Sequence, residues 1–258
     1  MQRPSISSSN VHAVRYGRKP GEALDWHEHH NLTLCFVIQG DYEETIRGRT
    51  FMCRSGDVVI KAPGARHLNK FGSRGAVCLL LEISEAFLKS SGFMDPSLTG
   101  PFQDHRLARI GLELQEELQL ADRLTPAMLD SIATRSLVSA LRLSETEAKR
   151  RRQQEAGWEL LHNVEGFAEK FLTSRERQHV RRAFCEINGC SIHSYGLKQR
   201  AFRAFAELVN SDNSLSDIAA GTGFYDQAHF TKVFVKLFGM TPGRLRSRTC
   251  NQQLAGNR

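Results

Sequence analysis

The sequence has no apolar stretch long enough to cross a bilayer. Its longest uninterrupted apolar run is the six residues Ala76–Leu81, whereas a membrane-spanning helix needs about 20. The opening residues MQRPSISSSN lack the basic segment followed by an apolar segment that marks an export signal. We therefore expect a cytoplasmic protein with no membrane partner.

The cysteines lack the spacings that mark zinc or disulfide-exchange sites. The chain has six of them, and no Cys-x-x-Cys pair occurs. A cytoplasmic location keeps thiols reduced. Cys35, Cys53 and Cys78 fall in predicted strands, where burial as small apolar side chains is favoured and a redox role stays open. No sequence signature joins a nucleophile to a base, so we expect no catalysis.

The positive charge of the chain is concentrated in its C-terminal part. Residues 149–258 hold 18 Lys and Arg against 10 Asp and Glu, which gives +8. Residues 1–148 hold the remaining 17 against 18, which gives −1. A basic module joined to a neutral one indicates a polyanion, such as nucleic acid, as the partner of the basic part alone.

The N-terminal third has the pattern of short antiparallel strands. Apolar and β-branched residues at 31–38 and 42–48 predict two strands, with a turn at Gln39-Gly40-Asp41 between them. Further strands are predicted at 50–53, 58–61 and 76–83, each bounded by turn residues. Turns every 8 to 12 residues are typical of a sandwich or barrel.

The pattern becomes helical from His105 onward. Apolar residues recur at helical spacing in residues 105–120 and again in residues 125–143. These two amphipathic helices either pack on the barrel or pair with a second subunit. The charged residues 149–154 indicate a solvated linker, and short helices are predicted from Trp158 to the end.

The most informative segment is SLSDIAAGTGFYDQAHFTKVFVKLFGMTPGRLR, residues 214–246. Ser214 or Ser216 can cap a first short helix, and Asp226 can cap a second one. Gly223 supplies the backbone freedom that a tight turn between helices requires. The second helix has an apolar face and polar residues near its N-terminus, the arrangement of a helix-turn-helix.

This segment resembles the second helix-turn-helix of the AraC/XylS family of bacterial transcription regulators. The resemblance rests on D-I-A, the G-T-G-F turn, D-Q-A-H-F, V-F-V-K-L-F-G and M-T-P-G-R-L-R. It implies double-stranded promoter DNA as a partner, a small-molecule effector, RNA polymerase and a homodimer, with activation favoured over repression. The DNA-binding residues expected in this unit are Tyr225, Asp226, Gln227, His229, Thr231, Lys232 and Lys236.

The family carries two such units, joined by a long helix that residues 194–209 resemble. Residues 175–191 resemble the first recognition helix, with Arg182 and Phe184 at the expected Arg-x-Phe. The turn before this helix is about two residues too long for the family pattern and lacks its glycine, so the register of the first unit is open. The candidate DNA contacts are Arg175, Arg177, Gln178, His179, Arg181 and Arg182, with solvated-face and phosphate-only roles as alternatives.

Two N-terminal segments, GEALDWHEHH and GDVVIKAPGARH, resemble the halves of a small cupin barrel. Enzyme cupins add a metal-binding glutamate after the first two histidines, but Thr33 and Leu34 occupy its place, and Glu43 and Glu44 lie across the predicted turn. We therefore expect no metal and no cofactor. The predicted effector pocket, with Trp26 stacking on the ligand, the histidines at its mouth and an arginine pairing with a carboxylate, comprises Trp26, His27, His29, Arg47, Arg66 and His67.

Together these features predict an α+β multidomain regulator. We expect a cupin-like antiparallel β-barrel that binds an effector at residues 1–100, a helical dimerisation segment at 101–148, a linker at 149–154, and an all-α double helix-turn-helix domain at 155–258. The predicted function is sequence-specific DNA binding that regulates transcription. The alternative is a metal-dependent cupin enzyme carrying a DNA-binding tail.

Overall fold

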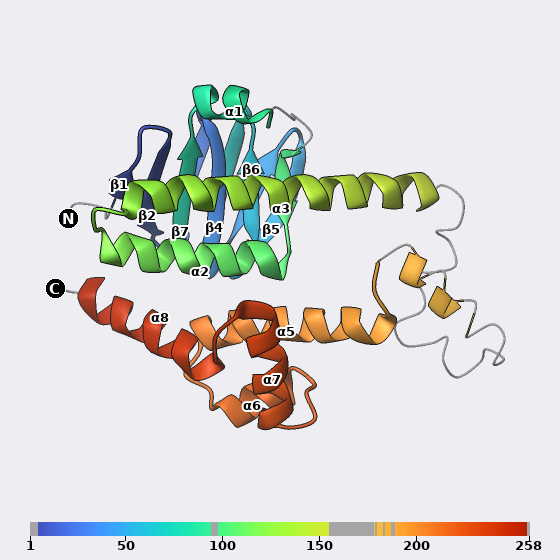
Figure 1. The fold of residues 1–258 in the computed structure, drawn as a ribbon. Helices are drawn as coiled ribbons and strands as arrows, with labels where there is room; N and C mark the ends of the chain where they lie inside the picture. The colour runs from blue at the N-terminus through green and yellow to red at the C-terminus, as the bar shows by residue number, and fades with distance from the viewer. Residues whose placement is uncertain are drawn as a thin grey trace.

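The computed structural model describes residues 5–93, 98–154, 178, 180–182, 184–186 and 189–256. Its N-terminal part is an antiparallel sheet with helices on one face, and its C-terminal part is helical (Figure 1). Within the part of the chain that the structure describes, no helix is both long and apolar enough to cross a membrane.

Eight strands form one sheet in the order β1-β2-β7-β4-β6-β8, with β3 paired to β7 and β5 paired to β4. Every pairing is antiparallel. The strands are β1 Ser5–Ser7, β2 Val11–Arg18, β3 Ala23–His27, β4 Leu32–Ile46, β5 Arg49–Arg54, β6 Val58–Lys61, β7 His67–Ile83 and β8 Gly100–Phe102.

The predicted turn at residues 39–41 is wrong, because β4 continues through it as one strand of 15 residues. The pairing of β4 with β7 is irregular on both sides of Gly40, so the chain bulges rather than turns. Gly40 has φ of 81°, and a Cβ there would lie 2.0 Å from the carbonyl oxygen of Gly75. Only glycine therefore permits this close approach of β4 and β7.

Both faces of the sheet are buried. Leu34, Phe36 and Leu81 belong to the main core, which helices cover. Cys35, Tyr42 and other alternate residues form a second cluster on the opposite face. Because no described helix contributes to that second cluster, the sheet must fold over onto itself there, as a barrel does.

Three helices cover the outer face of the barrel (Figure 1). They are α1 Glu85–Ser91, α2 His105–Leu120 and α3 Thr125–Gln154. The bounds of α2 are those predicted, and its apolar stripe, with Leu107 and Leu114, packs into the main core. The apolar faces of α2 and α3 are thus used within the chain, the first of the two predicted alternatives.

The predicted linker at 149–154 is instead the end of α3. This stretch, KRRRQQ, contains only good helix formers and no proline or glycine that would stop the helix. At the other predicted boundary, β8 extends the sheet to Phe102 by pairing with β6.

The C-terminal helices have their own core. They are α5 Ile192–Asn210, α6 Leu215–Gly221, α7 Gln227–Phe238 and α8 Pro242–Gly256. α5 contains the predicted long helix at 194–209. Its Phe202 and Phe205 pack against Phe234 and Phe238 of α7, with ring centroids 5.1–6.2 Å apart.

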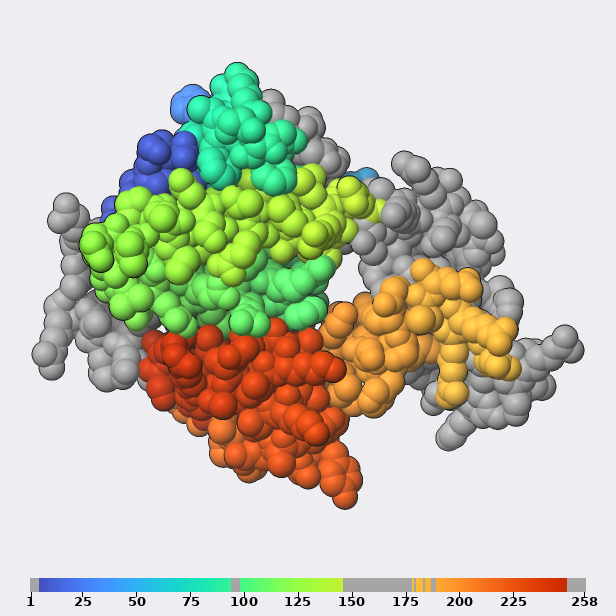
Figure 2. Space-filling model, viewed as in Figure 1, coloured from blue at the N-terminus to red at the C-terminus, as the bar shows by residue number. Residues whose placement is uncertain are grey.

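The two parts of the chain are in contact, with α2 between the barrel and the C-terminal helices (Figures 1 and 2). Ala108 and Leu112 on the second face of α2 belong to the C-terminal core. At the end of α5, the Asn210 side chain accepts a hydrogen bond from the Gly40 N–H (2.8 Å) and donates one to Ser55 Oγ (3.0 Å). The barrel and the helix-turn-helix region therefore share a packed interface.

Candidate functional site

Helices α6 and α7 form the helix-turn-helix that the sequence predicts. Ser214 is the N-cap of α6, where its side chain accepts a hydrogen bond from the Asp217 N–H. Asp226 is the N-cap of α7 and accepts from the His229 N–H at 2.7 Å. Gly223 between the helices has φ of 81°. The caps and the glycine therefore fix where each helix begins and how the chain turns between them.

The start of α7 presents polar side chains to solvent. Tyr225 is 92% exposed, and Gln227, Lys232 and Lys236 are also exposed. The Gln227 Oε1 accepts a hydrogen bond from Ser216 Oγ of α6 at 2.7 Å. That bond orients the amide and leaves its NH₂ group free to donate.

Three further predicted contact residues, Asp226, His229 and Thr231, are wholly or partly used inside the unit. The His229 ring meets the Phe224 ring edge to face, with centroids 5.6 Å apart, and Thr231 is half-buried. The His229 Nδ1 is buried and has no hydrogen-bond partner among the described residues. Asp226 acts as a cap, so its carboxylate serves the helix rather than offering a contact to an anion.

The first predicted unit is described only in part. Gln178, Arg181 and Arg182 are helical and exposed, whereas Arg175, Arg177 and His179 lie outside the described residues. Phe184, of the predicted Arg-x-Phe, meets Tyr195 of α5 edge to face at 5.5 Å. The contact residues of this unit stay a prediction.

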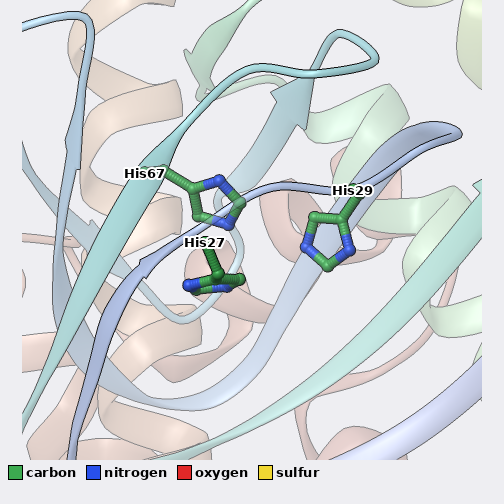
Figure 3. Close-up of side chains that lie close together, drawn as sticks. All are labelled: His27, His29 and His67. Atoms are coloured by element: carbon green, nitrogen blue, oxygen red, sulfur yellow. The ribbon is translucent and has the colours of Figure 1, made fainter.

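Three of the predicted effector residues come together at one end of the barrel. His27 ends β3, His29 lies in the connection to β4, and His67 begins β7; their imidazoles face one another (Figure 3). The ring centroids are 4.1–5.6 Å apart. One ring nitrogen from each histidine lies within 4.8 Å of the other two, a spacing from which a metal ion could draw ligands.

A buried polar cluster that the sequence analysis missed lies beside His67. Lys61 Nζ is 3.3 Å from His67 Nε2 and 3.4 Å from Glu44 Oε1. The second oxygen of Glu44 accepts a hydrogen bond from Asn69 Nδ2 at 2.9 Å. Glu44 is fully buried, and because β4 has no turn, it lies on the same strand as the barrel core rather than across a turn.

The alternation of inward and outward residues along β4 is the sequence signal that could have revealed this cluster. Counting by twos from the buried Cys35 passes through Val37 and, after the bulge, reaches Tyr42 and Glu44. A charged residue at an inward position indicates a polar interior.

Burial lowers the pKa of His67, the Lys61 ammonium acts in the same direction, and together with smaller effects they bring it to about 3. The ring is therefore neutral near pH 7, and the nitrogen that carries no proton can bind a ligand. Glu82 of β7 has its Oε1 3.5 Å from His29 Nδ1, and this contact lowers the pKa of Glu82.

The remaining predicted pocket residues lie at the surface of the same end. Trp26 is 48% exposed, and the Arg66 guanidinium lies 6.0 Å from the centre of its ring. Arg47 is exposed in the β4–β5 turn, directly after Ile46, the residue that pairs with His67. Cys35, Cys53 and Cys78 are fully buried, which confirms their predicted burial.

Two family models match the chain, and they match in sequence order. Residues 11–137 match the AraC-like ligand binding domain, and residues 172–248 match a helix-turn-helix domain. The matched ranges contain the histidine cluster and the α6–α7 unit respectively.

One curated relative aligns with nearly the whole chain, and another aligns with 26% of it. The chain is 26% identical over 268 aligned residues to the transcriptional activator RhaS of Yersinia pseudotuberculosis serotype I, covering 94% of this chain and 96% of RhaS. It is 40% identical over 68 residues to the probable transcription factor PqrA of Proteus vulgaris, which spans about half (56%) of PqrA.

Two solved structures align with parts or most of the chain. ToxT of Vibrio cholerae aligns over 94% of this chain and 99% of its own, with a TM-score of 0.45 and 10% identity. Oxalate decarboxylase of Bacillus subtilis aligns over 34% of this chain and 26% of its own, with a TM-score of 0.28 and 25% identity.

Proposed function

The chain belongs to the AraC/XylS family of transcription regulators, and we propose that it is a cytoplasmic activator whose barrel senses an effector. As a member of this family it is a sequence-specific DNA-binding protein. The observation that carries the proposal is the capped α6–α7 helix-turn-helix with its exposed polar face. We assign it no catalytic role, because the relatives that match it are transcription regulators.

In the proposed complex, α7 enters the major groove. The free NH₂ of Gln227 suits a base edge, and Lys232 and Lys236 suit guanine or phosphate oxygens. Tyr225, at the exposed start of the helix, lies where phosphate contacts fix the position of the protein. The first unit, through residues such as Arg181 and Arg182, would enter the next major-groove segment, about one helical turn away.

The contact between Asn210 and Gly40 supports a route from effector to DNA. Gly40 and Glu44 lie on the same strand, β4, and Glu44 lies beside the histidine cluster. Asn210 ends α5, the helix that packs on α7. An effector that shifts β4 would therefore change how α5 and α7 are held, which is a coupling between two sites.

We further propose a homodimer that recruits RNA polymerase. The core-facing residues of α2 and α3 are buried on the barrel. Large apolar side chains of this segment that stay exposed are Leu120, Leu124 and Met128, at the α2–α3 corner. A dimer contact at this corner would bury them.

Selection of bound duplexes from a random-sequence DNA pool, at two salt concentrations, tests the proposal. The expected result is a motif with two sub-sites about ten base pairs apart, with affinity that falls steeply as salt rises. Binding that depends on salt but enriches no sequence would contradict it. A motif with one sub-site would mean that the first unit reads no bases.

A further inference from the structure

We propose that the effector site is a metal site, in which His27, His29 and His67 bind one divalent transition-metal ion through their Nε2 atoms. The arrangement of the three rings in the barrel points to the metal site. Its role as the regulatory signal rests on the function proposed above. The expectation of a metal-free barrel depended on a missing glutamate in the sequence, and the arrangement of the three rings leads us to revise it.

The Nδ1 atom of each ring already has a partner. His27 Nδ1 is 2.7 Å from the Asp25 carbonyl oxygen, and His67 Nδ1 is 2.9 Å from the Ala65 carbonyl oxygen. A carbonyl only accepts, so each of these Nδ1 atoms carries the proton. The Nε2 atom of each ring therefore keeps its lone pair.

His29 has the same arrangement with a carboxylate in place of the carbonyl. Its Nδ1 lies 3.5 Å from Glu82 Oε1. Metal-binding histidines typically donate their second ring N–H to a backbone carbonyl or a carboxylate, which fixes the ring and its tautomer. All three rings of this cluster thus have the outer contacts of metal ligands.

The spacing of the three rings is close to what a metal ion requires. One nitrogen from each ring lies within 4.8 Å of the other two, and a tetrahedral ion with bonds of about 2.0–2.1 Å requires nitrogens about 3.3 Å apart. His27 and His29 are only half-buried, so theirs are the rings that would move to close this difference. Three imidazoles favour ions such as Zn²⁺ and Co²⁺ over Mg²⁺ and Ca²⁺, which prefer oxygen ligands.

Two charged side chains, Lys61 and Glu44, lie beside the cluster. Lys61 Nζ lies 3.3 Å from His67 Nε2, the atom that the metal would need. Glu44 Oε1 lies 3.4 Å from the same ammonium and receives no hydrogen bond among the described residues. When the ion binds His67, Lys61 can turn wholly to Glu44, so the carboxylate compensates for the nearby positive charge. Lys61 thus competes with the metal for His67.

Titration with Co²⁺, followed by the visible absorption of nitrogen-bound cobalt and by competition with Zn²⁺, tests the site in the full-length protein. We expect one ion per chain and no displacement by Mg²⁺. His27→Gln and His29→Gln should each weaken binding by at least about 100-fold, beyond the 10–100-fold effect of losing an outer contact. His30→Gln is the matched control, because His30 is an adjacent exposed histidine outside the cluster.

Lys61→Met gives a second test, in which metal binding should become tighter rather than weaker. Removing the ammonium frees His67 Nε2 and should tighten Zn²⁺ binding by about tenfold or more. Because this variant leaves Glu44 buried without its counter-ion, the double variant Lys61→Met, Glu44→Gln keeps the test valid if the single variant does not fold. Weaker Zn²⁺ binding by either folded variant would contradict the competition.

Unchanged cobalt binding in the His27 and His29 variants would overturn the metal site. The regulatory role is tested separately by measuring affinity for the selected DNA motif with and without Zn²⁺. A change that His29→Gln abolishes and His30→Gln retains supports the ion as effector, and equal affinity overturns that assignment. Failure of the DNA selection itself would instead contradict the proposed function, whatever the metal does.

Discussion

Asn210 is the residue whose loss should separate the two parts of the chain most cleanly. Its side chain accepts from the buried Gly40 N–H and donates to Ser55 Oγ, at 2.8 and 3.0 Å. Ser55 Oγ in turn donates to the Gly40 carbonyl at 3.1 Å. Asn210→Ala therefore removes two hydrogen bonds between the barrel and α5 and leaves a buried N–H unpaired.

The magnitude follows from those two bonds. At about 0.5–1.5 kcal/mol of net stabilisation each, their loss costs about 1–3 kcal/mol. This corresponds to a roughly 5- to 150-fold weaker docking equilibrium. The cost falls on docking, because Asn210 is the last residue of α5 and neither bond lies within the C-terminal helices.

Amide hydrogen exchange at Gly40 is the direct assay, since this N–H loses its acceptor. The Asn210→Ala variant should exchange Gly40 faster by up to that factor, while the amides of the barrel core stay protected. Asn213→Ala is the control, because Asn213 is exposed and its side chain donates a hydrogen bond to Glu207 of α5 rather than to the barrel. Equal Gly40 exchange in the two variants would refute the docking role.

Three further predictions concern single side chains. In denaturant melts, Asp226→Ala should lower the free energy of unfolding by about 1 kcal/mol through loss of the α7 cap, and Asp226→Asn should lower it by much less. Equal losses in the two variants would contradict the capping role. Burial raises the pKa of Asp57 from 3.8 to about 6, so the protonated form that stabilises the fold is lost as pH rises through 6. Between pH 4 and pH 7 the free energy of unfolding of Asp57→Asn should therefore rise by up to about 3 kcal/mol relative to that of wild type. A difference between the two proteins that does not change with pH would contradict this. Lys232→Ala should weaken binding to all DNA sequences alike and lower the slope of log affinity against log salt by about 0.9; an unchanged slope would remove Lys232 from the phosphate contacts.

The parts of the fold that the sequence predicts well are those set by local signals. The bounds of α2 and the Asp226 cap agree with the prediction, and Ser214 is one of the two predicted caps of α6, because helix periodicity and capping depend on residues three or four apart. The left-handed Gly223 between α6 and α7 was predicted for the same reason.

The parts that were missed depend on contacts between distant residues. Gln39-Gly40-Asp41 has the composition of a turn, but pairing with β7, some 35 residues away, turns it into a bulge. That error places Glu44 across a turn from the histidines, and so hides its contact with Lys61. The interface at Asn210 joins residues 170 apart in the sequence, and no local pattern reports such a contact.

The central claim is that α7 reads base edges, and the most direct test repeats the DNA selection with Gln227→Ala beside wild type. Gln227 is exposed at the first turn of α7 and is oriented by Ser216. The variant should enrich the same motif with one base-pair position relaxed, at a cost of about 1–3 kcal/mol for the preferred base. An identical motif with identical base preference at every position would contradict the placement of this face of α7 in the groove.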